Sequence, residues 1–142
     1  MNKQAKSVLS ISHFVFDELS FRRKGFQQAD QKDIPFEVGH SVKKTEENNY
    51  IVSLMLKVNK ENEYDAVVRI SGYCEVDDND PNKEILLHEN APAILYPYAR
   101  AQMTMLTSQP ETTPLVLPVV NVHELFHKDY QKKNDSTETH AE

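Results

Sequence analysis

The chain has 142 residues, a mass of 16.4 kDa and a formal net charge of −6, from 22 acidic and 16 basic side chains. That length suits one domain with a single core, and the acidic balance argues against nucleic acid as the main partner. No run of 18 apolar residues occurs, so we expect no membrane insertion. The lone Cys74 cannot form an intrachain disulfide and the N-terminus lacks the apolar segment of a signal peptide, so we expect a cytoplasmic protein.

Four stretches show the apolar–polar alternation that is typical of half-buried antiparallel strands. In one of them, Phe36, Val38, His40 and Val42 share a face. The polar segments TEENN, NKENE and DDNDPN between and after them are typical of turns. The stretches run from about Val8 to Arg23, Phe36 to Lys43, Tyr50 to Val58 and Ala66 to Val76. We therefore predict a four-stranded antiparallel meander.

After Lys83 the apolar residues recur at helical spacing. The pattern predicts a long helix from Pro92 to Ser108, with the proline in its first turn. The segment QPETTPLVLP is a proline-rich linker, and a second, shorter helix is predicted from Val122 to Lys133. Strands followed by helices indicate an α+β fold. We expect one domain over residues 1–133 and a disordered tail over residues 134–142, which hold no apolar residue larger than alanine.

The predicted second helix contains the letters HELFH, which match the pattern H-E-x-x-H. On a helix, His123 and His127 lie one turn apart and can hold zinc, with Glu124 as general base. A catalytic zinc site also needs a third protein ligand, which an upstream residue such as His88 or Glu89 would have to supply. The alternative is an amphipathic helix with one apolar face, formed by Val122, Leu125, Phe126 and Tyr130. We favour the amphipathic helix and keep a small zinc hydrolase as a remote alternative.

Two motifs in the second half of the chain resemble the SecB family of export chaperones. The first, ILYPYAR at residues 94–100, differs at one position from the family pattern I-L-F-P-Y-A-R. The second resembles L-N-L-P-P-V-N-F-D-A-L-F and follows at the family's separation. Its matching residues are Leu115, Leu117, Val120, Asn121, Leu125 and Phe126. The resemblance covers about residues 66 to 130 and places HELFH at the start of the family's lid helix.

This resemblance implies a protein that is not an enzyme and needs no cofactor. It implies an ATP-independent holdase that binds unfolded preproteins and passes them to the export motor SecA. Family members assemble as tetramers, with the long helices packed between two sheets. SecB-like chaperones that serve one client, such as an antitoxin, are the alternative that the resemblance leaves open.

A groove of flexible apolar side chains can bind many unfolded sequences. The resemblance gives this role to the linker and second helix, through Leu115, Leu117, Val122, Leu125, Phe126 and Tyr130. The alternative is that these residues close the protomer's own core. The predicted long helix carries apolar residues around more of its circumference than one sheet covers. We therefore expect Tyr98, Met105 and Leu106 at the interface of a homo-oligomer, a tetramer or at least a dimer.

In the family, acidic residues on the first and fourth strands form the surface that SecA binds. The resemblance gives this role to Glu18 and Glu75, whereas Arg22 reverses the charge at a third such position. The alternation along both strands predicts that all three side chains point out of the sheet. We therefore expect SecA docking to be weakened, and its complete loss would favour a chaperone dedicated to one client.

Overall fold

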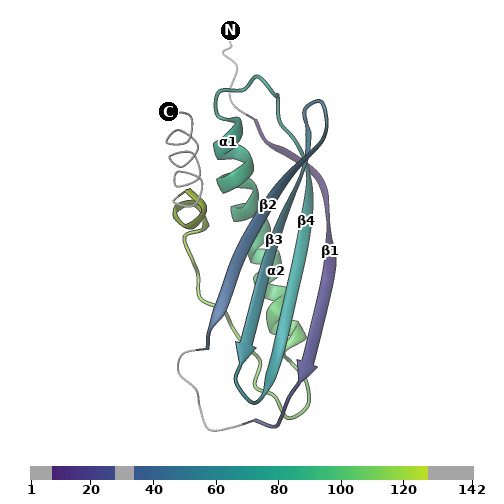
Figure 1. Ribbon diagram of the computed structural model, residues 1–142, viewed down its shortest axis with the longest axis vertical. Coiled ribbons are helices and arrows are strands. Elements are labelled where there is room, and N and C mark those ends of the chain that lie inside the picture. Colours follow the sequence, from purple (N-terminus) through teal and green to yellow (C-terminus); the bar gives the residue numbers. More distant parts are fainter. Residues whose placement is uncertain (1–7, 28–33, 128–142) are drawn as a thin grey trace, which may run out of the picture.

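The computed structural model describes residues 8–27 and 34–127, and the structural statements below concern these residues. In chain order they form β1 (Ser10–Arg23), β2 (Phe36–Glu46), β3 (Asn49–Lys60), β4 (Tyr64–Glu75), α1 (Lys83–Ile85), η1 (Leu86–Asn90) and α2 (Ala91–Leu106). A linker and a helical segment at residues 122–127 follow. The predicted α+β class is confirmed (Figure 1). The predicted domain end at residue 133 and the tail lie outside the described residues.

The order of the strands in the sheet differs from the predicted meander. The observed order is β1-β4-β3-β2, with every neighbouring pair antiparallel. Only β2, β3 and β4 form a meander, and β1 crosses over to pair with β4 from Ser10 opposite Glu75 to Arg23 opposite Tyr64. The physical reason is the length of the connections. Tight turns keep β2, β3 and β4 adjacent, whereas residues 24–35 between β1 and β2 are long enough to pass the ends of the other strands.

Asparagines close the two tight turns. Asn48 lies between β2 and β3, Asn62 lies between β3 and β4, and each has a φ angle of 65°. This left-handed conformation is tolerated by asparagine better than by most residues. The polar segments TEENN and NKENE, predicted as turns, are therefore confirmed.

The core lies between the sheet and α2, which crosses behind β3 and β4 (Figure 1). Alternate residues of these two central strands are buried on this face, as the period of two predicted. Helix α2 contributes Leu95, Ala99 and Met103, each fully buried. It approaches closely at Gly72, where an added Cβ would lie 3.2 Å from Cδ2 of Leu95. Cys74 also belongs to this core, and burial raises the pKa of its thiol to about 11.

The long helix begins earlier than predicted. Helical backbone starts at Lys83, continues through the π-helical turn η1 and passes into α2, so that Pro92 follows a turn instead of opening the helix. Proline has no backbone N–H, so Pro92 cannot donate the hydrogen bond that a helix residue normally makes to the preceding turn. The wider π-helical turn just before it lets the helix continue without that hydrogen bond. No helix among the described residues is long and apolar enough to cross a bilayer.

Candidate functional site

The linker after α2 runs back along the helix, held by a stripe of polar side chains. The Tyr96 hydroxyl donates a hydrogen bond to the carbonyl of Pro118 (2.8 Å), and Nε of Arg100 donates to Leu117 (2.7 Å). The Thr104 hydroxyl donates to the carbonyl of residue 115 at 2.8 Å. The three donors stand four residues apart, so they share one face of the helix. This stripe fixes an extended segment that has no secondary structure of its own.

From Leu115 to Pro118 the linker alternates between buried or partly buried and exposed side chains, as an extended chain does, whereas Val119 breaks this alternation. Leu117 is 2% exposed, whereas Val116 and Val119 are 66% and 82% exposed. Leu115 is partly buried against the core. Of the two predicted client-binding residues in the linker, Leu117 therefore lies in the core and Leu115 at its margin.

Asn121 starts the helical segment at residues 122–127. Its side-chain Oδ1 accepts a hydrogen bond from the backbone N–H of Glu124 (3.1 Å), which is the geometry of an N-cap. Val122 and Phe126, one turn apart, are 4% and 1% exposed, whereas Leu125 is 39% exposed. The amphipathic helix is thus confirmed for these residues, and Tyr130 lies outside the described residues.

An apolar groove of about 470 Å³ lies between β2 and the end of the linker. Phe36 and Val38 form one wall from the inner face of β2, which is an edge strand of the sheet. Val120 and Leu125 form the facing apolar wall, with Asn121 and Glu124 beside them. Of the predicted client-binding residues that the structure describes, Leu125 is the one that lines this groove. Phe36 and Val38 were not predicted to belong to the site, although the alternation of β2 indicates that they share a face.

A cluster of histidine and glutamate side chains joins the helical segment to η1. His127 Nδ1 lies 2.6 Å from Oε2 of Glu89, and His123 Nδ1 lies 3.8 Å from Oε1 of the same carboxylate. The fold brings Glu89, one of the possible upstream zinc ligands, to both histidines. Within residues 8–27 and 34–127, however, no three His, Cys, Asp or Glu side chains are arranged so that they could hold a metal ion.

A second apolar surface covers the outward side of α2 and the inner face of β1. Ile94, Tyr98 and Met105 are 48%, 49% and 65% exposed. The Tyr98 ring also contacts Phe14 of β1, with ring centroids 4.5 Å apart. Leu106, by contrast, is partly buried against the core. Two of the three predicted interface residues therefore lie on an exposed apolar face.

The opposite face of the sheet carries the predicted SecA-docking residues. Glu18 pairs with Arg69 at 3.5 Å, and Arg22 stands opposite Asp65 in the β1–β4 register. Both pairs lie on the strand positions that alternate with the buried core residues of β4, as predicted. Glu75 is exposed at the end of the same strand. The acidic charges of this face are thus interleaved with arginines.

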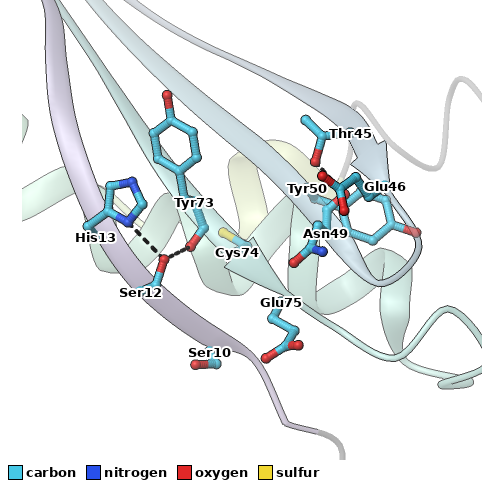
Figure 2. A pocket seen from close by; sticks show the side chains of 10 residues that line it. All are labelled: Ser10, Ser12, His13, Thr45, Glu46, Asn49, Tyr50, Tyr73, Cys74 and Glu75. Atoms are coloured by element: carbon cyan, nitrogen blue, oxygen red, sulfur yellow. Dashed lines mark hydrogen bonds between the residues drawn. The ribbon is translucent and has the colours of Figure 1, made fainter.

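Figure 2 shows a polar hollow of about 300 Å³ beside Glu75 at the end of this face. The His13 and Tyr73 rings stack there with centroids 4.3 Å apart. The Ser12 hydroxyl lies 2.9 Å from Nδ1 of His13 and donates to the carbonyl of Tyr73 at 3.3 Å. These bonds anchor a β-bulge in β1 next to the hollow.

Comparison with known proteins adds three findings. The family model of preprotein translocase subunit SecB matches residues 2–133. The chain is 24% identical to the uncharacterized protein MJ0357 of Methanocaldococcus jannaschii, over 97% of this chain and 95% of that protein. Its fold is similar to that of the Mycobacterium tuberculosis SecB-like chaperone Rv1957, solved with a ChAD peptide from the Rv1956 HigA1 antitoxin. That match has a TM-score of 0.65 and 15% identity, and covers 79% of this chain and 90% of that one.

Proposed function

The chain belongs to the SecB family of chaperones, and we propose that it is an ATP-independent holdase that binds unfolded polypeptides. The observation that carries this proposal is the apolar groove between Phe36 and Val38 of β2 and Val120 and Leu125. Unfolded chains expose apolar side chains, and an open apolar groove binds them without reading a particular sequence. This family is one of chaperones and not of enzymes.

In this proposal, some of the predicted client-binding residues contact the client and others only support the wall of the groove. Leu125 contacts the client directly, and Leu115 does so at the margin of the core. Leu117, Val122 and Phe126 are buried and act indirectly, by holding the wall of the groove in place. The client-binding role of Tyr130 remains a prediction. Because β2 is an edge strand in the sheet formed by the described residues, its outer edge also offers backbone groups with which an extended client can pair.

Two kinds of client fit this site. The first is an unfolded preprotein that is passed to SecA for export. The second is a dedicated client such as an antitoxin, as in the mycobacterial complex with an antitoxin peptide. The positive charge of Arg22 and the pairing of Glu18 with Arg69 favour the second, because both reduce the acidic character of the docking face.

Titration with SecA separates the two candidates. If the client is exported, wild-type protein binds SecA weakly, Arg22→Glu improves the affinity several-fold and Glu75→Lys reduces it. Both effects should be larger at low salt, because fewer dissolved ions then screen the exposed charges from each other. If none of the three proteins binds SecA while client binding is intact, the dedicated chaperone is favoured.

Assembly is part of the proposal. The apolar surface around Ile94, Tyr98 and Met105 favours association of copies of this chain, and we propose a tetramer. Burying such side chains stabilises an interface by about 25 cal/mol per Å² of apolar surface.

Binding of a labelled, permanently unfolded polypeptide tests the site. Leu125→Gln is compared with Val15→Gln, because the two side chains are 39% and 40% exposed but Val15 lies on β1, away from the groove. We expect about a tenfold loss of affinity for Leu125→Gln, from lost apolar burial, and little change for Val15→Gln. Equal effects of the two variants would refute the placement of the site.

A further inference from the structure

A hollow of about 370 Å³ lies on the outer face of the sheet, opposite α2, which is the face turned toward the viewer in Figure 1. Gly39 and Ser41 of β2 line it, together with Ser53 and Met55 of β3. Arg69 of β4 adds a guanidinium to the lining. The apolar groove proposed for clients shares no lining residue with this hollow and opens on the inner face of the sheet.

Gly39 stands inside strand β2 although nothing in its own chain requires a glycine there. An added Cβ would meet its nearest neighbour at 2.3 Å at Gly25 and at 3.2 Å at Gly72, the other two glycines. At Gly39 the nearest atom would be the flexible Cε of Met55, at 3.7 Å, which is ordinary contact. Gly39 has no positive φ angle, and the register of β2 with β3 has no bulge at this point.

A glycine inside a strand has a cost, because it brings no side chain to the sheet and loses much conformational freedom on folding. Strand glycines that serve neither a bulge nor a contact in their own chain allow another backbone to approach closely. At Gly39 the backbone of β2 is open on the outer face, beside the hollow. This points to a second polypeptide as the occupant.

The hydroxyl groups beside the hollow also suit a peptide. Ser71, which is 5% exposed, donates a hydrogen bond to Asp17, the extra residue of a β-bulge in β1. A hydroxyl has a single proton, so the 2.7 Å bond between Ser71 and Ser53 is donated by Ser53. The Ser53 oxygen is therefore left as a hydrogen-bond acceptor for the hollow. An acceptor suits a peptide N–H, whereas it would repel a bare anion.

The charges around the hollow favour carboxylates on that peptide. Glu18 pairs with Arg69 from the β1 side at 3.5 Å, but a guanidinium has five N–H donors and the Arg69 side chain is 49% exposed. Lys43 and Lys57 are exposed on the outer faces of β2 and β3, and neither pairs with a carboxylate of the described residues. Glu37, opposite Lys57 in the register, opposes them only in part.

We propose that this hollow binds an extended, acidic peptide segment of a partner protein. The peptide backbone passes over Gly39, and its carboxylates pair with Arg69, Lys43 and Lys57. This site does not depend on the proposed holdase function, because it lies on the other face of the sheet from the groove. The protein can therefore hold the acidic partner and a client at the same time.

Fluorescence anisotropy at low salt, with a short labelled peptide of alternating glutamate and threonine, tests the site. We expect Gly39→Val to weaken binding about tenfold, because the new side chain blocks the approach of the peptide. Thermal stability of this variant should be unchanged or higher, because valine favours strands. Arg69→Gln should weaken binding about threefold, the size that an exposed ion pair supports. Arg22→Gln removes the same charge from the outer face of β1 and should bind like wild type.

Absence of binding by the wild type would refute the proposal, as would equal binding of the matched glutamine–threonine peptide. Unchanged affinity in Gly39→Val would contradict the close approach, and equal losses in Arg69→Gln and Arg22→Gln would indicate general charge attraction instead of this site.

Two further controls identify the occupant. Leu125→Gln, altered in the client groove, should bind the acidic peptide like wild type, and a loss there would show that the peptide binds as a client. Displacement by millimolar inorganic phosphate, but not by sodium chloride of the same ionic strength, would assign the hollow to a small anion and overturn the peptide proposal.

Discussion

The Arg100 guanidinium Nε lies 2.7 Å from the carbonyl oxygen of Leu117 and donates a hydrogen bond to it. This bond ties together the two motifs that carry the family resemblance, because one motif ends at Arg100 and the other contains Leu117. The long helix thereby positions the linker that leads to the groove.

Replacing Arg100 by Leu should therefore loosen the linker and destabilise the protein. The loss of a hydrogen bond to a charged group predicts a decrease of about 1.5–3 kcal/mol in the free energy of unfolding. Urea denaturation measures it. Arg22→Leu is the control, because Arg22 is exposed on the outer face and surface substitutions usually change stability by about 0.5 kcal/mol or less. Equal stabilities of the two variants would contradict the role of Arg100.

Asp78 is predicted to make stability depend on pH. The Tyr50 hydroxyl, the Lys44 ammonium and the Asn48 backbone N–H all donate to its carboxylate, and they hold the Asp78 pKa well below its usual range. Burial and the hydrogen bond to Asp78 in turn raise the pKa of Tyr50 to about 12.

A depressed carboxyl pKa stabilises the folded state above the unfolded value, near pH 4, and this stabilisation is lost as the pH falls further. Asp78→Asn should consequently be less stable than wild type at pH 7, and the difference should shrink between pH 5 and pH 2. Urea denaturation across this range measures it. A difference that stays constant with pH would show that the carboxylate charge is not responsible.

Gly72 is predicted to be required by the packing of α2 on the sheet. In Gly72→Ala the new Cβ would stand 3.2 Å from the Leu95 side chain, which is tighter than ordinary contact. Overpacking of this kind costs about 1–3 kcal/mol of stability. Gly39→Ala is the matched control, because its Cβ would lie 3.7 Å from the flexible end of Met55. Thermal denaturation should rank Gly72→Ala clearly below Gly39→Ala, and the opposite order would be inconsistent with this packing.

The exposed apolar face of α2 is predicted to mediate assembly. The double variant Tyr98→Asp/Met105→Asp should have a lower molar mass than wild type in light scattering at micromolar concentration, because charges would be buried at the interface. Val116→Asp is a control of equal exposure, 66% against 65% for Met105, and should leave the mass unchanged. A monomeric wild type would rule out this role for the face.

Much of the fold was predictable because its signals are local. The alternation in β3 and β4 and the polar turn segments TEENN and NKENE depend on nearest neighbours in the chain, and both were predicted correctly. The start of the long helix at Lys83 was missed because Pro92 suggested a helix start, whereas a π-helical turn accommodates it inside a longer helix.

The pairing of β1 with β4 and the walls of the groove depend on contacts between distant parts of the chain. Phe36 and Leu125 each showed an apolar pattern, but nothing in the sequence indicates that the two would face each other. Likewise, the H-E-x-x-H pattern marked His123 and His127 and left Glu89 as one of the possible upstream partners, while the proximity of Glu89 to both histidines emerged only from the fold.

The central claim is that the protein is an ATP-independent holdase. The most direct test measures how the protein affects the aggregation of a chemically denatured client that is diluted into buffer without nucleotide. Light scattering by the client is recorded with increasing amounts of wild-type protein and of Leu125→Gln. We expect the wild type to suppress aggregation near stoichiometric ratio, and Leu125→Gln to require a several-fold excess. Undiminished aggregation at a stoichiometric ratio of folded wild-type protein would contradict the account.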